Sequence, residues 1–546
     1  MAVFKTPRVT LPCAIVPAEM VIRSIVLICV FALCLSAQVT PQDIEQGPNE
    51  NWLTYAGDYA SQRHSSLDQI NRGNVNRLVA KWVRNIPKSR KLETVPLVYQ
   101  GVMYATNTDE VYALDARNGK VIWDYAVEVE GRTGLTRGVA LVGDRVFFIS
   151  SDCRLIALNR KTGAFLWENE FASSADGYWS SLAPLAVKDQ IIVGVGGGGT
   201  GQRGFIASIS ATTGEEHWRF WTVPGEGEPG SETWGGFPLE WSGAPTWTTG
   251  SFDPDLNLIY WPTGNPWPDF HGGRRKGDNL YSDSVVAVDA DSGEMKWYFQ
   301  FTPWDEWDWD ANETPVLIDA EWEGKPRKLM IQANRNGFYY VLDRETGEFL
   351  LGTPFVERLN WATGLDPKGR PIEVPGMRPT TGGVRICPSV RGASNWMSPS
   401  YNPDTGLFYV VTLEMCDIYT SSAKDGRPST GFRGTGSQQI PAEPGEMFLR
   451  ALDPLTGKKV WEHPMPGPAK MWAGTVSTAG GLVFSGDDDG NLVALDAKTG
   501  EDLWHFQTGH MIYASPMTFE LDGRQYVTIA AETALYTFGL FSEPRP

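Results

Sequence analysis

Short alternating runs of apolar residues, each followed by a turn and a second run, recur along the chain. In one copy, residues 111–114 lead through a turn at Gly119 to a run that ends at Trp123. A strand, a tight turn and a second strand explain this pattern. The frame ends on tryptophan in six copies, at Trp123, Trp167, Trp218, Trp297, Trp461 and Trp504, and a degenerate copy ends at Leu351.

The turn of each copy carries residues suited to a tight bend. Glycine supplies the positive φ that the bend needs, and an Asp or Asn before it can hydrogen-bond the turn backbone. These acceptors are Asp115, Asn159, Asp289, Asp343, Asp453 and Asp496.

The spacing of the copies indicates a repeat of about 45 residues with insertions, because successive copies end 43 to 110 residues apart. This length matches one four-stranded propeller blade. The 110-residue interval has room for a hidden blade, to which residues 406–412 supply a strand. We therefore predict an all-β, eight-bladed β-propeller with four-stranded antiparallel blades, formed by residues 38–546 as a single domain. The recurrent tryptophan is expected to wedge between neighbouring blades.

Composition narrows the functional classes. Of the 546 residues, 42% are hydrophobic and 21% charged, which excludes a mostly disordered chain. The 47 basic residues against 65 acidic ones give a formal net charge of −18. Nucleic acids and anionic membrane surfaces are therefore poor partners for this chain.

Residues 1–37 resemble a secretory leader. Arg23 precedes an apolar run at 24–35, small residues follow it, and Met20 is a plausible true start. The run is short for a membrane span, although a single N-terminal anchor is the alternative. We expect a periplasmic or secreted protein with no transmembrane domain in the mature chain.

The cysteines outside the leader are Cys153, Cys387 and Cys416. In an exported chain we expect Cys387 and Cys416 to form a disulfide and Cys153 to be a buried thiol. No Cys-x-x-Cys-His motif for covalent haem occurs, so electrons are expected to leave through a separate partner.

Three stretches fall outside the repeat, at residues 193–204, 260–266 and 302–312. In the last, Asp308 and Asp310 would point to one side of an extended segment, where paired carboxylates can hold a hard cation or act as a base. The alternative is an acidic surface loop. The Gly-rich stretch 193–204 leads into a strand at Gly204 and lacks the context of a dinucleotide or phosphate loop. Motifs of zinc and serine hydrolases are absent from the sequence.

Several longer motifs resemble those of the pyrroloquinoline quinone (PQQ) dependent alcohol dehydrogenases, in the soluble type without a cytochrome c domain. They are Pro262-Thr-Gly-Asn-Pro266, Asp305-Glu-Trp-Asp-Trp-Asp310, Ala333-Asn-Arg-Asn-Gly-Phe-Tyr-Tyr340, Gly392-Ala-Ser-Asn-Trp396 after Cys387-Pro388, and Trp472-Ala-Gly-Thr-Val-Ser-Thr-Ala-Gly-Gly481. The resemblance runs from about residue 51 to 539. It implies a quinoprotein propeller with PQQ in the axial channel, a calcium or lanthanide ion beside the quinone, and a disulfide between Cys387 and Cys416.

The resemblance also assigns roles to residues of this chain. The implied PQQ-binding residues are Glu93, Arg137, Ser181, Trp247, Arg335, Asn395 and Trp472, and the implied metal-binding residues are Asn265, Asp308 and Asp310. Asp308 is also the implied catalytic base. Arginine and hydroxyl groups suit the carboxylates of PQQ, and an indole face suits its flat ring.

Two positions depart from the family pattern. Gly199 stands where the family has a metal-binding Glu, which should weaken a hard-cation site unless Asp310 or water compensates. The vicinal cysteine pair of many members is also missing, because residues 130–137 contain no cysteine.

The resemblance thus implies oxidation of a small alcohol by hydride transfer to PQQ, with the metal ion as Lewis acid. The implied electron acceptor is a cytochrome c or a quinone, and a homodimer is possible. Two alternatives stay open: a non-catalytic propeller scaffold, and a PQQ-dependent sugar dehydrogenase.

Overall fold

The computed structural model describes residues 38–89, 91–129, 135–424, 432–467, 469 and 473–541. The predicted leader, residues 1–37, and the predicted site residue Trp472 lie outside the described residues.

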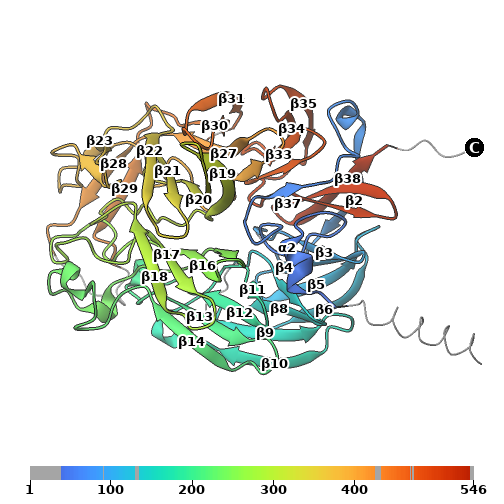
Figure 1. Ribbon diagram of the computed structural model, residues 1–546, viewed down its shortest axis with the longest axis horizontal. Coiled ribbons are helices and arrows are strands. Elements are labelled where there is room, and N and C mark those ends of the chain that lie inside the picture. The colour runs from blue at the N-terminus through green and yellow to red at the C-terminus, as the bar shows by residue number, and fades with distance from the viewer. Residues whose placement is uncertain are drawn as a thin grey trace, which may run out of the picture.

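The described residues form a ring of β-sheets that follow one another in chain order (Figure 1). Seven of these sheets have four antiparallel strands, and an eighth has five because a short N-terminal strand joins it in parallel. The predicted all-β architecture with four-stranded blades is therefore confirmed.

The first four sheets around the ring are consecutive meanders. Their strands are β3 (Leu97–Tyr99), β4 (Val102–Asn107), β5 (Glu110–Asp115) and β6 (Val121–Ala126); β7 (Ala140–Val142), β8 (Arg145–Ile149), β9 (Arg154–Asn159) and β10 (Phe165–Glu170); β11 (Leu185–Val187), β12 (Gln190–Gly194), β13 (Phe205–Ser210) and β14 (Glu216–Trp221); and β15 (Ser251–Asp253), β16 (Leu258–Pro262), β17 (Ser284–Asp289) and β18 (Met295–Gln300).

Two of the other four large sheets also contain a strand from the N-terminal part of the chain. Their strands are β19 (Val316–Trp322), β20 (Lys325–Ala333), β21 (Phe338–Asp343) and β22 (Phe349–Pro354); β26 (Ser400–Asn402), β27 (Leu407–Glu414), β30 (Glu446–Leu452) and β31 (Lys459–Met465); β1 (His64–Ser65), β32 (Thr475–Thr478), β33 (Leu482–Gly486), β34 (Asn491–Asp496) and β35 (Asp502–Gln507); and β2 (Leu78–Asn85), β36 (Met517–Leu521), β37 (Arg524–Ala531) and β38 (Ala534–Leu540).

Smaller elements fill the long connections. They are the sheets of β23 (Ala362–Leu365) with β24 (Pro371–Glu373) and of β25 (Val384–Ile386), β28 (Asp417–Ser421) and β29 (Thr435–Gln439); the helix α2 (Pro41–Glu45); and the 3₁₀ helices η1 (Val75–Arg77), η2 (Ser174–Asp176), η3 (Gly198–Thr200), η4 (Ser231–Trp234) and η5 (Leu239–Trp241). The strand predicted from residue 406 is confirmed as β27, within the 110-residue interval that also holds both small sheets.

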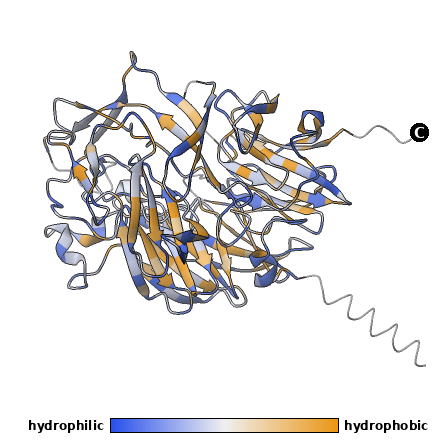
Figure 2. Ribbon diagram, turned by 45° about the horizontal axis from the view of Figure 1, so that its top comes forward, coloured by the Kyte–Doolittle hydropathy of each residue, from blue (hydrophilic) through white to orange (hydrophobic). Residues whose placement is uncertain are grey.

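The core lies between neighbouring sheets. Middle strands such as β13 are buried at every position, whereas the outermost strand β6 alternates between partly covered and exposed residues. Apolar residues accordingly concentrate within the sheets in Figure 2. The predicted Cys387–Cys416 disulfide is present, and Cys153 is a buried free thiol. No helix among the described residues is long and apolar enough to span a membrane.

The recurrent tryptophans join one sheet to the next. The indole Nε1 of Trp218, on the outermost strand β14, donates to the carbonyl of Ala290 in the following sheet at 3.0 Å. The ring also covers the turn glycine of that sheet, so that a Cβ on Gly293 would lie 2.5 Å from it. The same contact recurs between Trp123 and Gly163. The predicted wedge between blades is therefore confirmed.

The N-terminal strand β2 completes the ring. It pairs antiparallel with β38, so the last sheet combines one strand from the N-terminal part of the chain with the last three strands. Trp82 on β2 then docks on the turn of the first sheet, where its Nε1 donates to the carbonyl of Ala116 at 3.0 Å. The pairing gives the last sheet four strands, like most of the other large sheets.

Candidate functional site

A cavity of about 1040 Å³ opens among loops that connect the inner strands of successive sheets. The lining residues occupy two recurrent positions: some lie just before the first strand of a sheet, and others just after its second strand. Seven of the ten predicted site residues line this cavity: Arg137, Ser181, Trp247, Asn265, Asp308, Asp310 and Arg335. The repeat therefore brings together residues that are nearly 200 positions apart in the sequence.

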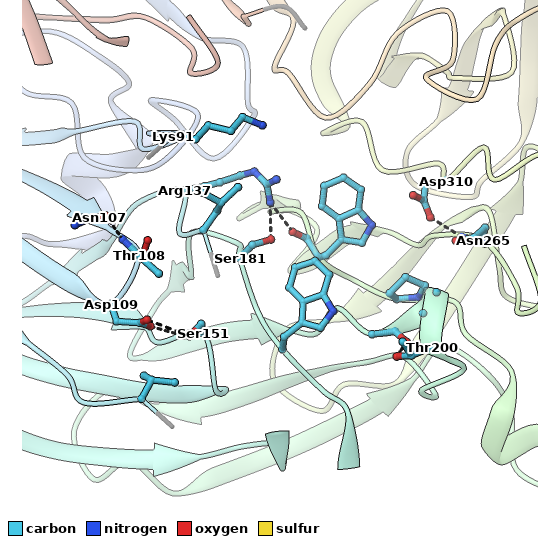
Figure 3. A pocket seen from close by; sticks show the side chains of 18 of the residues that line it. Lys91, Asn107, Thr108, Asp109, Arg137, Ser151, Ser181, Thr200, Asn265 and Asp310 are labelled. Carbon is cyan, nitrogen blue, oxygen red and sulfur yellow. Dashed lines mark hydrogen bonds between the residues drawn. The ribbon is translucent and has the colours of Figure 1, made fainter. Parts of the chain in front are cut away.

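One side of the cavity is built around Arg137. Its guanidinium donates to Ser181 Oγ at 2.7 Å (Figure 3). It also donates to Glu93 Oε2 at 2.8 Å. Lys91 Nζ lies 2.6 Å from the other oxygen of Glu93. Two cations therefore share one carboxylate, which leaves this side with a net positive charge.

Aromatic rings hold the Arg137 guanidinium in place. Its Cζ lies 5.0 Å from the ring centroid of Trp247 and 4.1 Å from that of Trp396, within cation–π range. The indole of Trp179 is a second ring at the cavity wall, against which Gly196 packs so closely that a Cβ there would lie 2.5 Å from it. Sequence reasoning missed Trp179 and Trp396, because a tryptophan-rich repeat gives no local sign of which indoles face the channel.

The opposite side of the cavity holds Asp310 and Asn265, which lie away from Arg137 and Ser181 in Figure 3. Asp310 Oδ1 accepts a hydrogen bond from the backbone N–H of Asn265 at 2.7 Å, and its Oδ2 accepts one from Arg335 Nη1 at 2.9 Å. Gly264 allows this approach, because a Cβ there would lie 2.2 Å from Asp310 Oδ1. Both oxygens of Asp310 are thus engaged by the protein itself.

Asp308 lines the same cavity as Asp310, as predicted, but the segment is not extended. Its φ of 62° is left-handed. Trp307 and Trp309 are buried and stack with centroids 5.0 Å apart, so the segment is not an acidic surface loop. Burial, reinforced by the charge of Asp269, raises the pKa of Asp308 well above that of an ordinary aspartate.

Two further charged residues complete this side and were not predicted. Asp269 is fully buried, and its Oδ1 accepts a hydrogen bond from Asn265 Nδ2 at 2.9 Å. Arg433 forms ion pairs with both Asp269 and Asp308. Asp269 follows a recognised motif by only three residues, so it could have been found. Arg433 comes from a long connection that carries no pattern.

Three predicted residues do not line the cavity within the described structure. Glu93 is buried and reaches it through Arg137 and Lys91. Asn395 donates to the Arg391 carbonyl at 2.8 Å, and its contact with a cofactor stays a prediction. Trp472 lies outside the described residues.

The donor set fits PQQ. The Nε atoms of Arg137 and Arg335 are buried without a protein partner among the described residues, so each has a hydrogen-bond donor to spare. Arg137, Ser181 and Lys91 suit the carboxylates of such a ligand, and Trp247 offers its indole to a flat ring.

The same residues do not fit a hard cation in this arrangement. Gly199 offers no side-chain oxygen, Asp310 is engaged by Asn265 and Arg335, and Asp308 is paired with Arg433. Within the described ranges, no group of three or more His, Cys, Asp or Glu side chains is placed to hold a metal ion.

Comparison with known proteins shows the family of this chain. A family model described as the glucose/ethanol/alcohol dehydrogenase β-propeller domain, of the PQQ type, matches residues 52–359 and 468–527. The chain belongs to this family. Among relatives of the PQQ propeller family, the quinoprotein alcohol dehydrogenase PedH of Pseudomonas putida is 39% identical over 531 residues, which cover 91% of this chain and 88% of the relative. The quinohemoprotein alcohol dehydrogenase of Comamonas testosteroni is 38% identical, over 88% of this chain and 72% of the relative.

Solved structures of the family superpose closely. The quinohemoprotein alcohol dehydrogenase ADHIIG from Pseudomonas putida HK5 matches with a TM-score of 0.86 and 34% identity, covering 92% of this chain and 82% of that one. A europium-containing methanol dehydrogenase matches with a TM-score of 0.83 and 31% identity, covering 91% and 99%. The ring of sheets is thus the β-propeller of this family.

Proposed function

We propose that this protein is a PQQ-dependent dehydrogenase that oxidises a small alcohol to the aldehyde or ketone. The observation that carries the proposal is a single cavity with a cationic, indole-lined side at Arg137 and an acidic side at Asp308. Such a cavity can bind an anionic aromatic cofactor and place a carboxylate beside its reacting edge. Membership of the PQQ family supports the same activity.

Bound PQQ supplies a quinone carbonyl that accepts hydride from the alcohol carbon. The chain's own residues orient the reactants and move the proton. Arg137 and Ser181 hold one edge of the cofactor, and Arg335 lies beside Asp310 at the other side. Asp308 Oδ2 is bound by Arg433, so Oδ1 is the atom that takes the hydroxyl proton.

The proposal extends to features around the site. The eight large sheets are interpreted as eight blades of one propeller, and the protein as periplasmic or secreted after loss of residues 1–37. The electron acceptor is a separate cytochrome c or quinone, since the printed sequence has no haem-attachment motif. A homodimer remains part of the proposal. The predicted calcium or lanthanide ion is left out of the proposal, because the carboxylates of Asp308 and Asp310 are already paired with the protein.

The test is dye reduction by the purified protein after loading with PQQ, over a panel of alcohols, aldehydes and glucose. We expect reduction with at least one small alcohol, and a loss of kcat by about 10²- to 10⁴-fold in Asp308→Asn while PQQ stays bound. Asp366→Asn, an exposed change in a surface turn, is the matched control. Bound PQQ with no reduction of the dye by any substrate would refute the alcohol dehydrogenase proposal, and oxidation of glucose alone would favour the sugar dehydrogenase.

A further inference from the structure

The guanidinium of Arg433 occupies the acidic side of the cavity. Its Nε donates to Asp269 Oδ2, and its Nη2 donates to Asp308 Oδ2 at 2.8 Å. Asp269 is fully buried and the Asp308 side chain is 14% exposed, whereas that of Arg433 is 49% exposed. The arginine therefore reaches in from the surface to pair with two carboxylates that are shielded from water.

Gly199 leaves room for this guanidinium. A Cβ built on Gly199 would lie 3.6 Å from Arg433 Nε, 3.8 Å from its Nη2 and 3.7 Å from Asp269 Oδ2. A longer side chain pointing the same way would run into the arginine. The backbone of Gly199 lies outside the left-handed region, so it would accept another residue. The missing side chain and the inserted arginine are thus complementary.

Charge argues against a metal ion in the same place. An arginine stays protonated at every accessible pH. Its guanidinium binds carboxylates through paired hydrogen bonds, so it can take the place that a hard cation would have between them. A divalent or trivalent ion among Asn265, Asp269 and Asp308 would lie beside a permanent positive charge. The ion would have to displace Arg433 and break both ion pairs before it gained its oxygen ligands.

We propose that Arg433 is the built-in cation of this site, held by Asp269 and Asp308 in the space left by Gly199, and that it stands in for a calcium or lanthanide ion beside the bound cofactor. The inference rests on the proposed function for the identity of that cofactor. It makes Arg433 a residue of the active site, with the role of holding the Asp308 carboxylate in place.

The experiment compares wild type with Arg433→Ala, Gly199→Glu/Arg433→Ala and Arg433→Lys. Arg370→Ala is the matched control, because Arg370 is 50% exposed and pairs with Asp278 as Arg433 does with its partners. Each protein is titrated with Tb³⁺ without PQQ, and tryptophan-sensitised luminescence is read. Each is also loaded with PQQ in Ca²⁺ or La³⁺, desalted, and its metal content measured by mass spectrometry.

We expect wild type, Arg370→Ala and Arg433→Lys to retain far less than one metal ion per chain, and wild type to keep its PQQ after treatment with EDTA. The double variant should bind Tb³⁺ at least about tenfold more tightly than wild type and retain about one ion per chain, because it gains a carboxylate and loses a cation. Arg433→Ala should fall between them. Arg433→Lys tests the charge if Arg433→Ala fails to fold.

One tightly held ion per chain in wild type, or Tb³⁺ affinities that do not differ between the double variant and Arg370→Ala, would overturn the inference. Failure of the proposed function would give a different set of results. In that case no variant takes up PQQ or reduces the dye, while the Tb³⁺ titration of PQQ-free protein still reports whether Arg433 excludes the ion.

Discussion

At the residue scale, Arg137 shows how a site is prepared for a ligand before it arrives. Ser181 and Glu93 fix two nitrogens of its guanidinium, and its buried Nε stays unpartnered among the described residues. An arginine fork held in this way loses little freedom on binding a carboxylate. Lysine would keep the charge and lose the fork.

Arg137→Lys is therefore expected to weaken PQQ binding by about 10- to 100-fold, equivalent to about 1.4 to 2.8 kcal/mol. The measurement is quenching of tryptophan fluorescence as PQQ is added to the apo protein. Arg117→Lys is the control, because Arg117 pairs with Asp522 at the surface. Equal affinity in the two variants would show that Arg137 does not contact the cofactor.

A second buried residue, Glu313, is expected to control stability through pH. Its side chain is 2% exposed, Oε2 has no partner among the described residues, and burial raises its pKa to about 8. The folded protein thus binds a proton between pH 4.5 and about 8 that the unfolded chain releases. Folding stability should fall as pH rises through this window.

Glu313→Gln is expected to raise the free energy of unfolding by about 2–4 kcal/mol at pH 9 and to change it little at pH 4.5, since one pKa unit corresponds to about 1.4 kcal/mol. Urea denaturation at both pH values measures the difference. The exposed change Glu501→Gln should have no such pH dependence. A benefit that is equal at both pH values would mean that Glu313 is ionised in the folded protein.

At the scale of elements, a turn glycine can both adopt a left-handed backbone and leave space for a tryptophan ring. Gly293 has a φ of 71° and also lies beneath the ring of Trp218. Gly406 has a φ of 66° in the same kind of turn, but no atom lies within 4 Å of the position its Cβ would take. The pair separates the cost of left-handed backbone from the cost of displacing the indole.

Gly406→Ala is accordingly expected to lower the free energy of unfolding by about 1 kcal/mol, from backbone strain alone. Gly293→Ala should lower it by about 2–4 kcal/mol, because the methyl group also pushes Trp218 off its neighbouring sheet. Denaturant titration of both variants measures the difference. Similar losses in the two would show that the tryptophan contact contributes little to stability.

The sequence predicts the strands and turns better than the site, because strands and turns depend on neighbouring residues and the site depends on distant ones. Strands, turns and tryptophan wedges follow from short patterns, so β27 was found in an interval without an obvious repeat. The cavity residue Arg137 was predicted only through resemblance to a family, whereas Asp308 was also indicated by its spacing from Asp310 in the sequence. Arg433 was not found, because its partners Asp269 and Asp308 lie more than 120 residues away and only the closed ring brings them together.

At the scale of the whole molecule, the ring is closed where strand β2, from the N-terminal part of the chain, pairs with the last strand, β38. Strand β2 pairs with β38, and Trp82 on β2 docks on Gly119 of the first sheet. In each other large sheet the four main strands follow one another along the chain, whereas β2 is far in sequence from β36, β37 and β38 of its own sheet. The join is held by non-covalent contacts alone, and the cavity residue Arg137 lies in the segment between the first two sheets.

Trp82→Ala should therefore disturb the molecule differently from Trp461→Ala, although the two indoles are 8% and 9% exposed and both dock on a turn glycine. Each change is expected to cost about 3–5 kcal/mol. Hydrogen exchange should accelerate across β2 and β38 in Trp82→Ala, because the ring opens at its join. In Trp461→Ala, where β31 follows β30 of the same sheet along the chain, faster exchange should stay near β31. Equal protection of β2 and β38 in both variants would mean that strand pairing alone closes the propeller.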